Sequence, residues 1–202
     1  MTTFADLGLS PKILKALELT NMTTPTPIQA QAIPHIMKGS DLMGLAQTGT
    51  GKTAAFGLPL LEMIDPQEKH TQALVLAPTR ELGRQIAEQL GKFSKHVKGL
   101  KVLPVYGGAA IMNQIKDLKK PTHIIIATPG RLIDLIKRKA VKLDQLKFLV
   151  LEEADEMVSM GFKEELDEIL SYTPENKQTW LFSATMAKEI KRIVSKYMDD
   201  PI

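Results

Sequence analysis

Six short apolar runs constrain the fold of this chain more than any other feature of its sequence. Each run has four or five residues and is nearly continuous rather than alternating, which is typical of strands covered on both faces. The runs are Leu42–Ala46, Ala73–Ala77, Val102–Tyr106, His123–Ala127, Phe148–Leu151 and Thr179–Phe182. Between them lie stretches with helical spacing, such as Leu82, Ile86 and Leu90. This alternation predicts an α/β fold with a mostly parallel sheet and helices on both faces.

Composition narrows the class of protein. The chain has 202 residues and 44% hydrophobic residues, enough for one domain with a proper core. It has no cysteine, which excludes a disulfide framework and a thiolate metal site. No apolar run approaches the roughly 20 residues that a membrane helix needs, and the N-terminus has no apolar signal segment. We therefore expect a cytoplasmic protein without membrane contact. The formal net charge of +3 permits an anionic partner without requiring one.

The segment before the first apolar run differs from the rest. Ser10 and Pro11 predict a helix start, with Ser10 as the cap. The prolines at 25 and 27 then force an extended stretch, and a second helix is predicted from Ile28 to Met37. This segment is interpreted as a helical appendage to the sheet.

A phosphate loop follows the first apolar run and opens a helical stretch. It consists of Ala46, Gln47, Thr48, Gly49, Thr50, Gly51, Lys52 and Thr53. Glycines let backbone N–H groups converge on phosphate oxygens, and the helix N-terminus adds a favourable dipole. Lys52 supplies a charge for the β and γ phosphates, and the Thr53 hydroxyl can ligate Mg²⁺. The alternative is a glycine- and threonine-rich surface turn.

Three closely spaced carboxylates, those of Glu152, Glu153 and Asp155, follow the fifth apolar run, in the stretch VLEEADEM from Val150 to Met157. A nucleotide-bound Mg²⁺ needs a carboxylate at the end of a second strand, and a neighbouring acid can orient the attacking water. Glu152, Glu153 and Asp155 are therefore candidates for metal and water handling. The alternative is a solvated acidic helix start, because acids are favoured in a first turn.

Together these and other segments resemble, over essentially the whole chain, the first of the two RecA-like domains of DEAD-box RNA helicases. The residues that carry the resemblance are the glutamine motif Thr26–Gln29 with the upstream aromatic Phe4, the loop AQTGTGKT, Pro78–Leu82, Gly107–Gly108, Thr128–Arg131, Glu152–Asp155 and Ser183–Thr185. Each short motif is weak alone. Their order at successive strand ends makes the resemblance specific.

The resemblance implies a role for each matching residue. ATP would be bound by Phe4, Gln29, Gln47, Thr48, Gly49, Thr50, Gly51, Lys52 and Thr53. Lys52, Glu152, Glu153 and Asp155 would serve catalysis, and Thr53, Glu152 and Asp155 would hold Mg²⁺, partly through water. RNA would be gripped by its backbone, without sequence preference, at Pro78, Arg80, Gly107, Gly108, Thr128, Pro129, Gly130 and Arg131. Ser183 and Thr185 would couple the two sites. Intradomain salt bridges are the alternative for Arg80 and Arg131.

Two departures from the family pattern affect these expectations. Asn21 and Met22 stand where the family has glycine and an aromatic residue, with little expected consequence. Glu152 stands where the family has aspartate, and its extra methylene keeps the charge but moves the carboxylate. Because Mg²⁺ tolerates displaced ligands poorly, we expect Mg·ATP to bind and hydrolysis to be impaired.

The resemblance also predicts the organisation of the protein. Residues 1–40 would be a helical adenine-recognition segment, 41–198 the sheet core, and 199–202 the start of a linker to a second RecA-like domain that this chain lacks. We expect a monomer that binds ATP and grips single-stranded or duplex RNA weakly, with negligible turnover alone.

Several alternative functions stay open. One is an ATP-gated RNA clamp or scaffold component without efficient turnover, which Glu152 favours. Others are a DNA helicase of another superfamily and a phosphate-loop protein unrelated to nucleic acid. The basic run 137–142, KRKAVK, is interpreted as a solvated helix end, with an extra RNA patch as its alternative.

Overall fold

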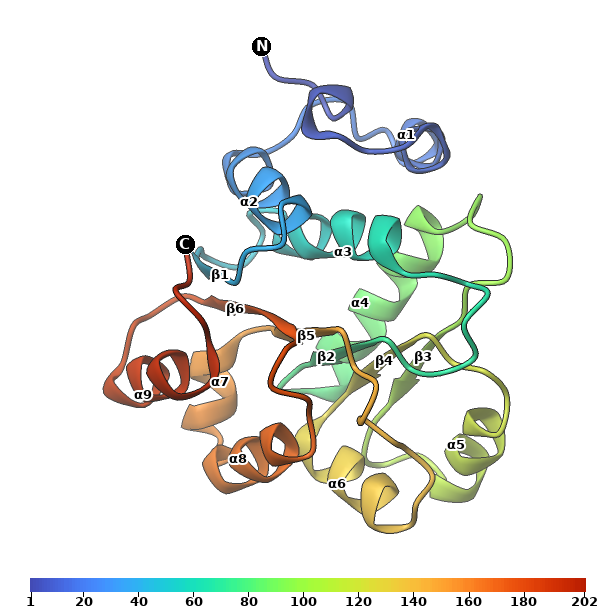
Figure 1. The fold of residues 1–202 in the computed structure, drawn as a ribbon, viewed down its shortest axis with the longest axis vertical. Helices are drawn as coiled ribbons and strands as arrows, with labels where there is room; N and C mark the ends of the chain where they lie inside the picture. Colours follow the sequence, from blue (N-terminus) through green and yellow to red (C-terminus); the bar gives the residue numbers. More distant parts are fainter.

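The computed structural model describes residues 1–202 and has a six-stranded parallel sheet at its centre (Figure 1). The strands are β1 (Leu42–Leu45), β2 (Ala73–Leu76), β3 (Val102–Val105), β4 (Ile124–Ala127), β5 (Phe148–Leu151) and β6 (Gln178–Ser183). They lie in the order β1-β6-β5-β2-β4-β3, and every neighbouring pair is parallel. Each predicted strand is present, with ends that differ by at most one residue from the apolar run.

Helices cover both faces of this sheet. They are α1 (Pro11–Leu19), α2 (Pro27–Met37), α3 (Lys52–Met63), α4 (Arg80–Phe93), α5 (Ile111–Leu118), α6 (Pro129–Lys137), α7 (Ala154–Ser159), α8 (Lys163–Ser171) and α9 (Lys188–Tyr197), with a short 3-10 helix at Ala5–Leu7. Helices α1 to α4 build one hydrophobic core against the sheet, and α5 to α9 pack on a second core at the other face (Figure 1). The predicted α/β architecture is therefore correct.

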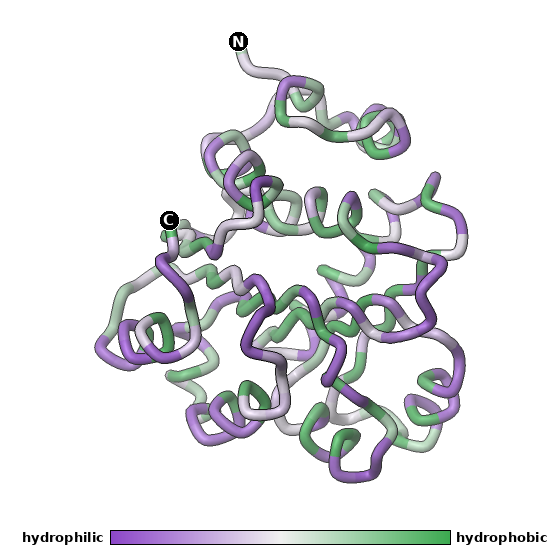
Figure 2. The backbone as a smooth tube through the Cα atoms, in the orientation of Figure 1, coloured by the Kyte–Doolittle hydropathy of each residue, from purple (hydrophilic) through white to green (hydrophobic).

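Strand β5 shows why the apolar runs are continuous. Phe148 and Val150 belong to the first core, whereas Leu149 and Leu151 belong to the second. Because successive side chains point to opposite faces and both faces are covered, no position on the strand favours a polar residue. Figure 2 shows hydrophobic colours along the strands and mixed colours along the helices. The two cores together bury the sheet on both faces.

The two ends of the chain contact different elements, α3 and β1. Ser10 occupies the cap position of α1 as predicted, but its side chain makes no capping bond, and its N–H instead donates to Glu62 Oε1. At the other end, residues 199–202 return to β1 (Figure 1), where Met43 N–H donates to Ile202 O at 2.8 Å. None of the helices combines the length and apolar character needed to cross a membrane.

Candidate nucleotide site and adjoining loops

Every predicted site segment inside the sheet core begins where a strand ends. The segments are the phosphate loop after β1, residues 77–82 after β2, 106–110 after β3, 128–131 after β4, 152–155 after β5 and 183–185 after β6. Since all strands are parallel, their carboxyl ends meet at one edge, which is where ligands bind in such sheets. Phe4 and Gln29 come from the N-terminal segment instead.

The phosphate loop curls through two glycines with positive φ, Gly49 at +83° and Gly51 at +89°. Gly51 is the residue from which α3 begins, so that Lys52 and Thr53 form its first turn. Gly51 also has no room for a side chain, because a Cβ there would lie 2.5 Å from the Nε2 atom of Gln29. The loop therefore presents a helix N-terminus and backbone N–H groups to the cavity described below.

Gln29 joins the N-terminal segment to this loop. Its side chain is buried, its Oε1 accepts from the backbone N–H of Thr26 at 3.0 Å, and its Nε2 donates to Gly51 O at 3.1 Å. The amide therefore bonds both to the turn before α2 and to the end of the phosphate loop. An amide oxygen has two lone pairs and an amide nitrogen two hydrogens, so each atom keeps one further hydrogen-bonding capacity.

Lys52 and Glu152 form a buried ion pair across the edge of the sheet. Lys52 Nζ lies 3.3 Å from Glu152 Oε1, and both side chains are at most 6% exposed. The other oxygen, Glu152 Oε2, is buried without a hydrogen-bond partner. Burial raises the pKa of the Glu152 carboxyl to about 7, and the Lys52 ammonium opposes this rise only in part. An orphaned, poorly solvated carboxylate oxygen is a group that a cation would satisfy.

The three candidate acids Glu152, Glu153 and Asp155 do not converge on one point. Glu153 adopts the left-handed conformation, with φ +51°, at the cap position of the short helix α7, and its side chain makes no capping bond. Asp155 Oδ2 instead accepts hydrogen bonds from Thr185 N–H and Thr185 Oγ1, both at 3.1 Å. No group of three or more acidic or histidine side chains could hold a metal ion by itself. Any ion here would need oxygens from a ligand or water as well.

A short chain of bonds links this acidic turn to the end of β6. Ser183 Oγ donates to Thr185 O at 2.7 Å, and Thr185 in turn donates to Asp155. The acidic turn is therefore in direct contact with the segment Ser183–Thr185.

A cavity of about 510 Å³ brings the predicted nucleotide residues together. Its lining includes Gln29, Thr48, Gly49, Gly51, Lys52, Thr53, Glu152 and Glu153. Gln47 and Thr50 do not line it, although the Thr50 hydroxyl donates to Gln47 O within the loop. Phe4 does not line it either, because the residue is only 4% exposed and packs in the first core. The structure thus offers a base no free face of Phe4 in this conformation.

The structure accommodates Asn21 and Met22, the residues that depart from the family pattern. Asn21 has φ +55°, a left-handed conformation that asparagine tolerates better than most residues other than glycine. Met22 is half-buried and lines the 510 Å³ cavity. The backbone turn that a glycine would make is therefore present.

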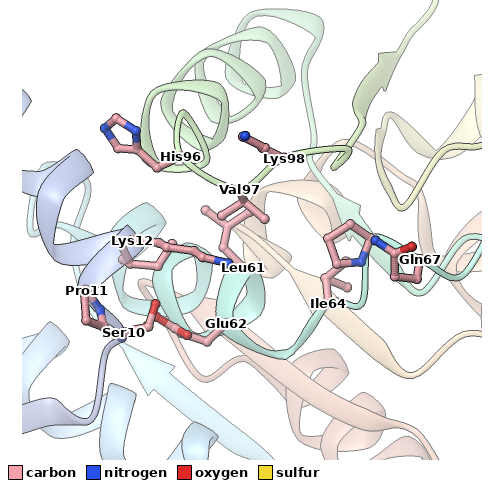
Figure 3. Close-up of a pocket in the computed structure, with 12 residues that line it drawn as sticks. Ser10, Pro11, Lys12, Leu61, Glu62, Ile64, Gln67, His96, Val97 and Lys98 are labelled. Carbon is pink, nitrogen blue, oxygen red and sulfur yellow. The ribbon is translucent and has the colours of Figure 1, made fainter.

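Another cavity, of about 760 Å³, lies away from the phosphate loop, between α1, the end of α3 and the loop after α4. Figure 3 shows Ser10 and Glu62 close together on one side of it and His96 and Lys98 on the other. None of the predicted site residues lines this cavity. Chemistry, rather than size, therefore selects the smaller cavity as the nucleotide site.

Neither Arg80 nor Arg131 forms a salt bridge, so the alternative role considered for them is wrong. The Arg80 guanidinium is exposed and stacks 4.9 Å from the centre of the Tyr106 ring. Arg131 Nη1 donates to Ala109 O at 3.0 Å and to Gln114 Oε1 at 2.9 Å. Both arginines therefore lie beside the loop that contains Gly107 and Gly108.

Gln114 and Tyr106 are parts of this arrangement that the sequence motifs missed. Gln114 is buried, accepts from Arg131 and donates through Nε2 to Tyr106 O at 3.1 Å. Its side chain thus joins the loops after β3 and β4. The signal in the sequence is a glutamine on the apolar face of a helix, between Ile111 and Leu118.

Comparisons with known proteins agree with this geometry. The family model described as "DEAD/DEAH box helicase" matches residues 26–193. The chain is 52% identical over 201 residues to the DEAD-box ATP-dependent RNA helicase CshA of Bacillus cereus, covering all of this chain and 38% of that protein. It is 52% identical over 200 residues to the ATP-dependent RNA helicase DeaD of Escherichia coli, covering 99% of this chain and 32% of that one.

A solved structure confirms the fold. The crystal structure of a DEAD box protein from the hyperthermophile Methanococcus jannaschii superposes with a TM-score of 0.95 at 40% identity. The match covers all of this chain and 55% of that one. The chain therefore spans about a third to a half of the length of the proteins that it resembles.

Proposed function

This chain belongs to the DEAD/DEAH box helicase family, and we propose that it is the first of two RecA-like domains of an ATP-dependent RNA helicase. Its coverage of 38% and 32% of two relatives supports a whole protein with further parts. In this proposal residues 1–40 recognise adenine, residues 41–198 form the catalytic core, and residues 199–202 begin the linker to the second domain.

The observation that carries the proposal is the meeting of Gln29, the phosphate loop and Glu152 in one cavity. The loop amides, the α3 N-terminus and Lys52 offer positive potential to phosphates. The amide of Gln29 has one free lone pair and one free hydrogen, which suit the edge of adenine and not that of guanine. A phosphate loop alone would not make that distinction.

The residues present fit a magnesium ion. Glu152 Oε2 is buried without a partner, and hydroxyl and carboxylate oxygens are the ligands that Mg²⁺ prefers. Thr53 and Glu152 would hold the ion, and Asp155 would act through water. The ion would neutralise charge on the β and γ phosphates. Lys52, whose ammonium pairs with Glu152, would turn it towards those phosphates.

Glu153 would orient the attacking water, and Glu152 would slow the reaction. The Glu152 carboxylate stands one methylene further from the backbone than the aspartate of the family pattern. Where catalysis depends on positioning, a displacement of about 1 Å can lower the rate by about 10²-fold. We infer that the chain binds Mg·ATP and that the whole protein hydrolyses it inefficiently.

RNA would be held by its backbone at the loops after β2, β3 and β4. Arg80 is exposed, is unpaired by any carboxylate and lies beside the loop at Gly107–Gly108. Arg131 donates to Ala109 O in the same loop. Such contacts to phosphates and sugars carry no sequence information. The Asp155–Thr185 bonds would transmit the state of the nucleotide to the end of β6. In the whole protein, ATP would close the two domains on RNA and pry a short duplex apart.

The alternative is an ATP-gated RNA clamp without efficient turnover. The feature that favours it is Glu152 itself, whose longer side chain stands where the family pattern has aspartate. Steady-state ATP turnover of the whole protein with RNA separates the two functions. Turnover well above background contradicts the clamp.

Calorimetric binding of ATP and GTP to this chain and to Gln29→Ala tests the adenine assignment. We expect ATP affinity to fall at least tenfold in the variant while GTP affinity changes little. Gln31→Ala, an exposed position on the same helix, should bind both nucleotides like the unaltered chain. An equal loss for ATP and GTP would show that Gln29 only supports the loop, and no ATP binding by the unaltered chain would refute the proposed function.

A further inference from the structure

A pocket of about 470 Å³ lies at the opposite edge of the sheet from the nucleotide site. It is formed by the loops that lead into β2, β4 and β5, which lie to the right of the sheet in Figure 1. Its basic lining consists of Lys69, His70, Lys119, Lys120, Lys139 and Lys142, and we call it the basic pocket. Part of the run 137–142, interpreted from the sequence as a solvated helix end, therefore lines this pocket.

The charge of the basic pocket is not compensated within the chain. Its five lysines are exposed and form no salt bridge, and the lining contains one carboxylate, Asp144. His70 pairs with Glu68 outside the lining. The lining alone thus carries more positive charge than the formal net charge of +3 of the whole chain. Like charges held together repel each other, so an anion would be attracted here.

The lysines stand on a rigid frame. Strands β5, β2 and β4 are neighbours in the sheet, so the loops that lead into them span two strand spacings, roughly 10 Å. The Thr71 hydroxyl donates to Thr122 O at 2.9 Å and so ties two of these loops together. The backbone N–H of Lys147 donates to Gln72 O at 2.8 Å and ties in the third.

Helix capping accounts for only part of this cluster. Lys119 follows the end of α5 and Lys139 that of α6, where cations interact favourably with the helix dipole. Lys69 and Lys142 lie at no helix end. Lys139 also has φ +58°, a conformation in which glycine would be unstrained.

We propose that the basic pocket binds the phosphate backbone of an RNA duplex. The lining has lysines and no arginine, tryptophan, tyrosine or phenylalanine. Protein interfaces are depleted of lysine and enriched in aromatic residues, which argues against an acidic protein partner. Single-stranded binding relies on aromatic stacking platforms, which are absent here. The remaining mode of binding is contact between lysine ammonium groups and phosphates. A duplex presents its phosphates outward, where these lysines can reach them.

The position of the pocket suits this role, which rests on the proposed function. Helices α5 and α6 begin at the loops assigned to RNA and end at the basic pocket. The nine residues of α6 span about 13 Å. One RNA could therefore lie with a single strand at the first edge and its duplex arm at the second.

The test compares binding of a hairpin RNA with a single-stranded tail and of the tail alone, at several salt concentrations. The pocket variant is Lys119→Gln, Lys120→Gln, Lys139→Gly and Lys142→Gln combined. Lys139→Gly removes a charge and relieves the positive φ, which protects the fold. The matched control is Lys15→Gln, Lys38→Gln, Lys95→Gln and Lys188→Gln combined, four exposed lysines without salt bridges away from the pocket.

We expect the pocket variant to bind the tailed hairpin at least tenfold more weakly and the tail alone unchanged. The slope of the salt dependence for the hairpin should fall by about one unit for each phosphate that the variant no longer neutralises. An equal loss in the control, an equal loss for tail and hairpin, or no loss at all would overturn the proposal. So would lysine-dependent binding of polyglutamate without any effect on the hairpin.

The outcome also separates this inference from the proposed function. If the unaltered chain fails to bind ATP but its hairpin binding still depends on the pocket lysines, the pocket assignment is supported and the helicase assignment is overturned.

Discussion

Gly51 is the residue at which the nucleotide site tolerates least change. Its φ of +89° is strained for any residue with a side chain, and a Cβ would lie 2.5 Å from Gln29 Nε2. We expect Gly51→Ala to lower the free energy of unfolding by about 2–4 kcal/mol, from backbone strain plus displacement of Gln29. Urea denaturation measures this directly.

Gly49 provides the matched comparison for that substitution. Its φ of +83° is similar, but a Cβ there would meet nothing within 4 Å. Gly49→Ala should therefore cost only the backbone strain, about 1–2 kcal/mol. If both variants lose the same stability, the close approach of Gln29 to Gly51 has no energetic consequence.

Glu152 should make the stability of the nucleotide-free chain depend on pH. Because its pKa rises from 4.5 to about 7, the folded chain binds more protons than the unfolded chain between these values. The contribution of Glu152 to the free energy of unfolding should therefore be fully present below about pH 4.5 and fall by about 3 kcal/mol as pH rises through about 7. Relative to Glu152→Gln, the unaltered chain should lose this amount between pH 4.5 and 8.

A charge control for this measurement lies in the same turn. Glu156→Gln removes an exposed carboxylate close in sequence but outside the cavity. If the difference in free energy of unfolding between the unaltered chain and Glu152→Gln does not change between pH 4.5 and 8, the cavity solvates Glu152 better than its burial indicates.

At the scale of elements, the sequence predicts what local patterns determine. The strands were predictable because each is apolar on both faces, and the site segments because each follows a strand. The engagement of Gln29 with Gly51 was not, since it depends on how α2 packs on α3. The basic pocket also depends on tertiary arrangement and was not predictable. Its loops precede strands β4, β2 and β5, which become neighbours only through the sheet order.

Gln114 shows how α5 positions the loops on either side of it. Gln114→Leu would leave Tyr106 O and part of the Arg131 guanidinium without their partner. We expect a loss of about 1–3 kcal/mol in stability and roughly tenfold weaker RNA binding, with ATP affinity unchanged. Calorimetry with ATP and fluorescence anisotropy with a short single-stranded RNA measure the two affinities separately.

The exposed neighbour Asn113 gives a control on the same helix, and Asn113→Ala should change neither affinity. A Gln114 variant that loses ATP and RNA affinity equally would contradict a role confined to the RNA loops.

At the scale of the whole molecule, the sheet separates two kinds of anion chemistry. The edge where the strands end holds glycine loops, a buried lysine and a buried carboxylate, which suit a bound nucleotide. The edge where they begin holds exposed, unpaired lysines, which suit a solvated polyanion. Helices α5 and α6 connect the two edges. An RNA bound at both edges would therefore have a fixed orientation relative to this domain within a longer protein.

The substitution Glu152→Asp tests how far this chain departs from an efficient enzyme. In the whole protein with RNA, we expect the aspartate variant to turn over ATP about 10²-fold faster, because the carboxylate recovers the reach of the family pattern. In this chain alone both forms should stay near background, since an arginine supplied from outside a phosphate-loop domain is worth about 10³–10⁵ in rate. Steady-state phosphate release with saturating Mg·ATP measures both. Equal turnover of the two forms in the whole protein would show that the backbone accommodates the longer side chain, and Glu152 would then be a neutral variation in a working helicase.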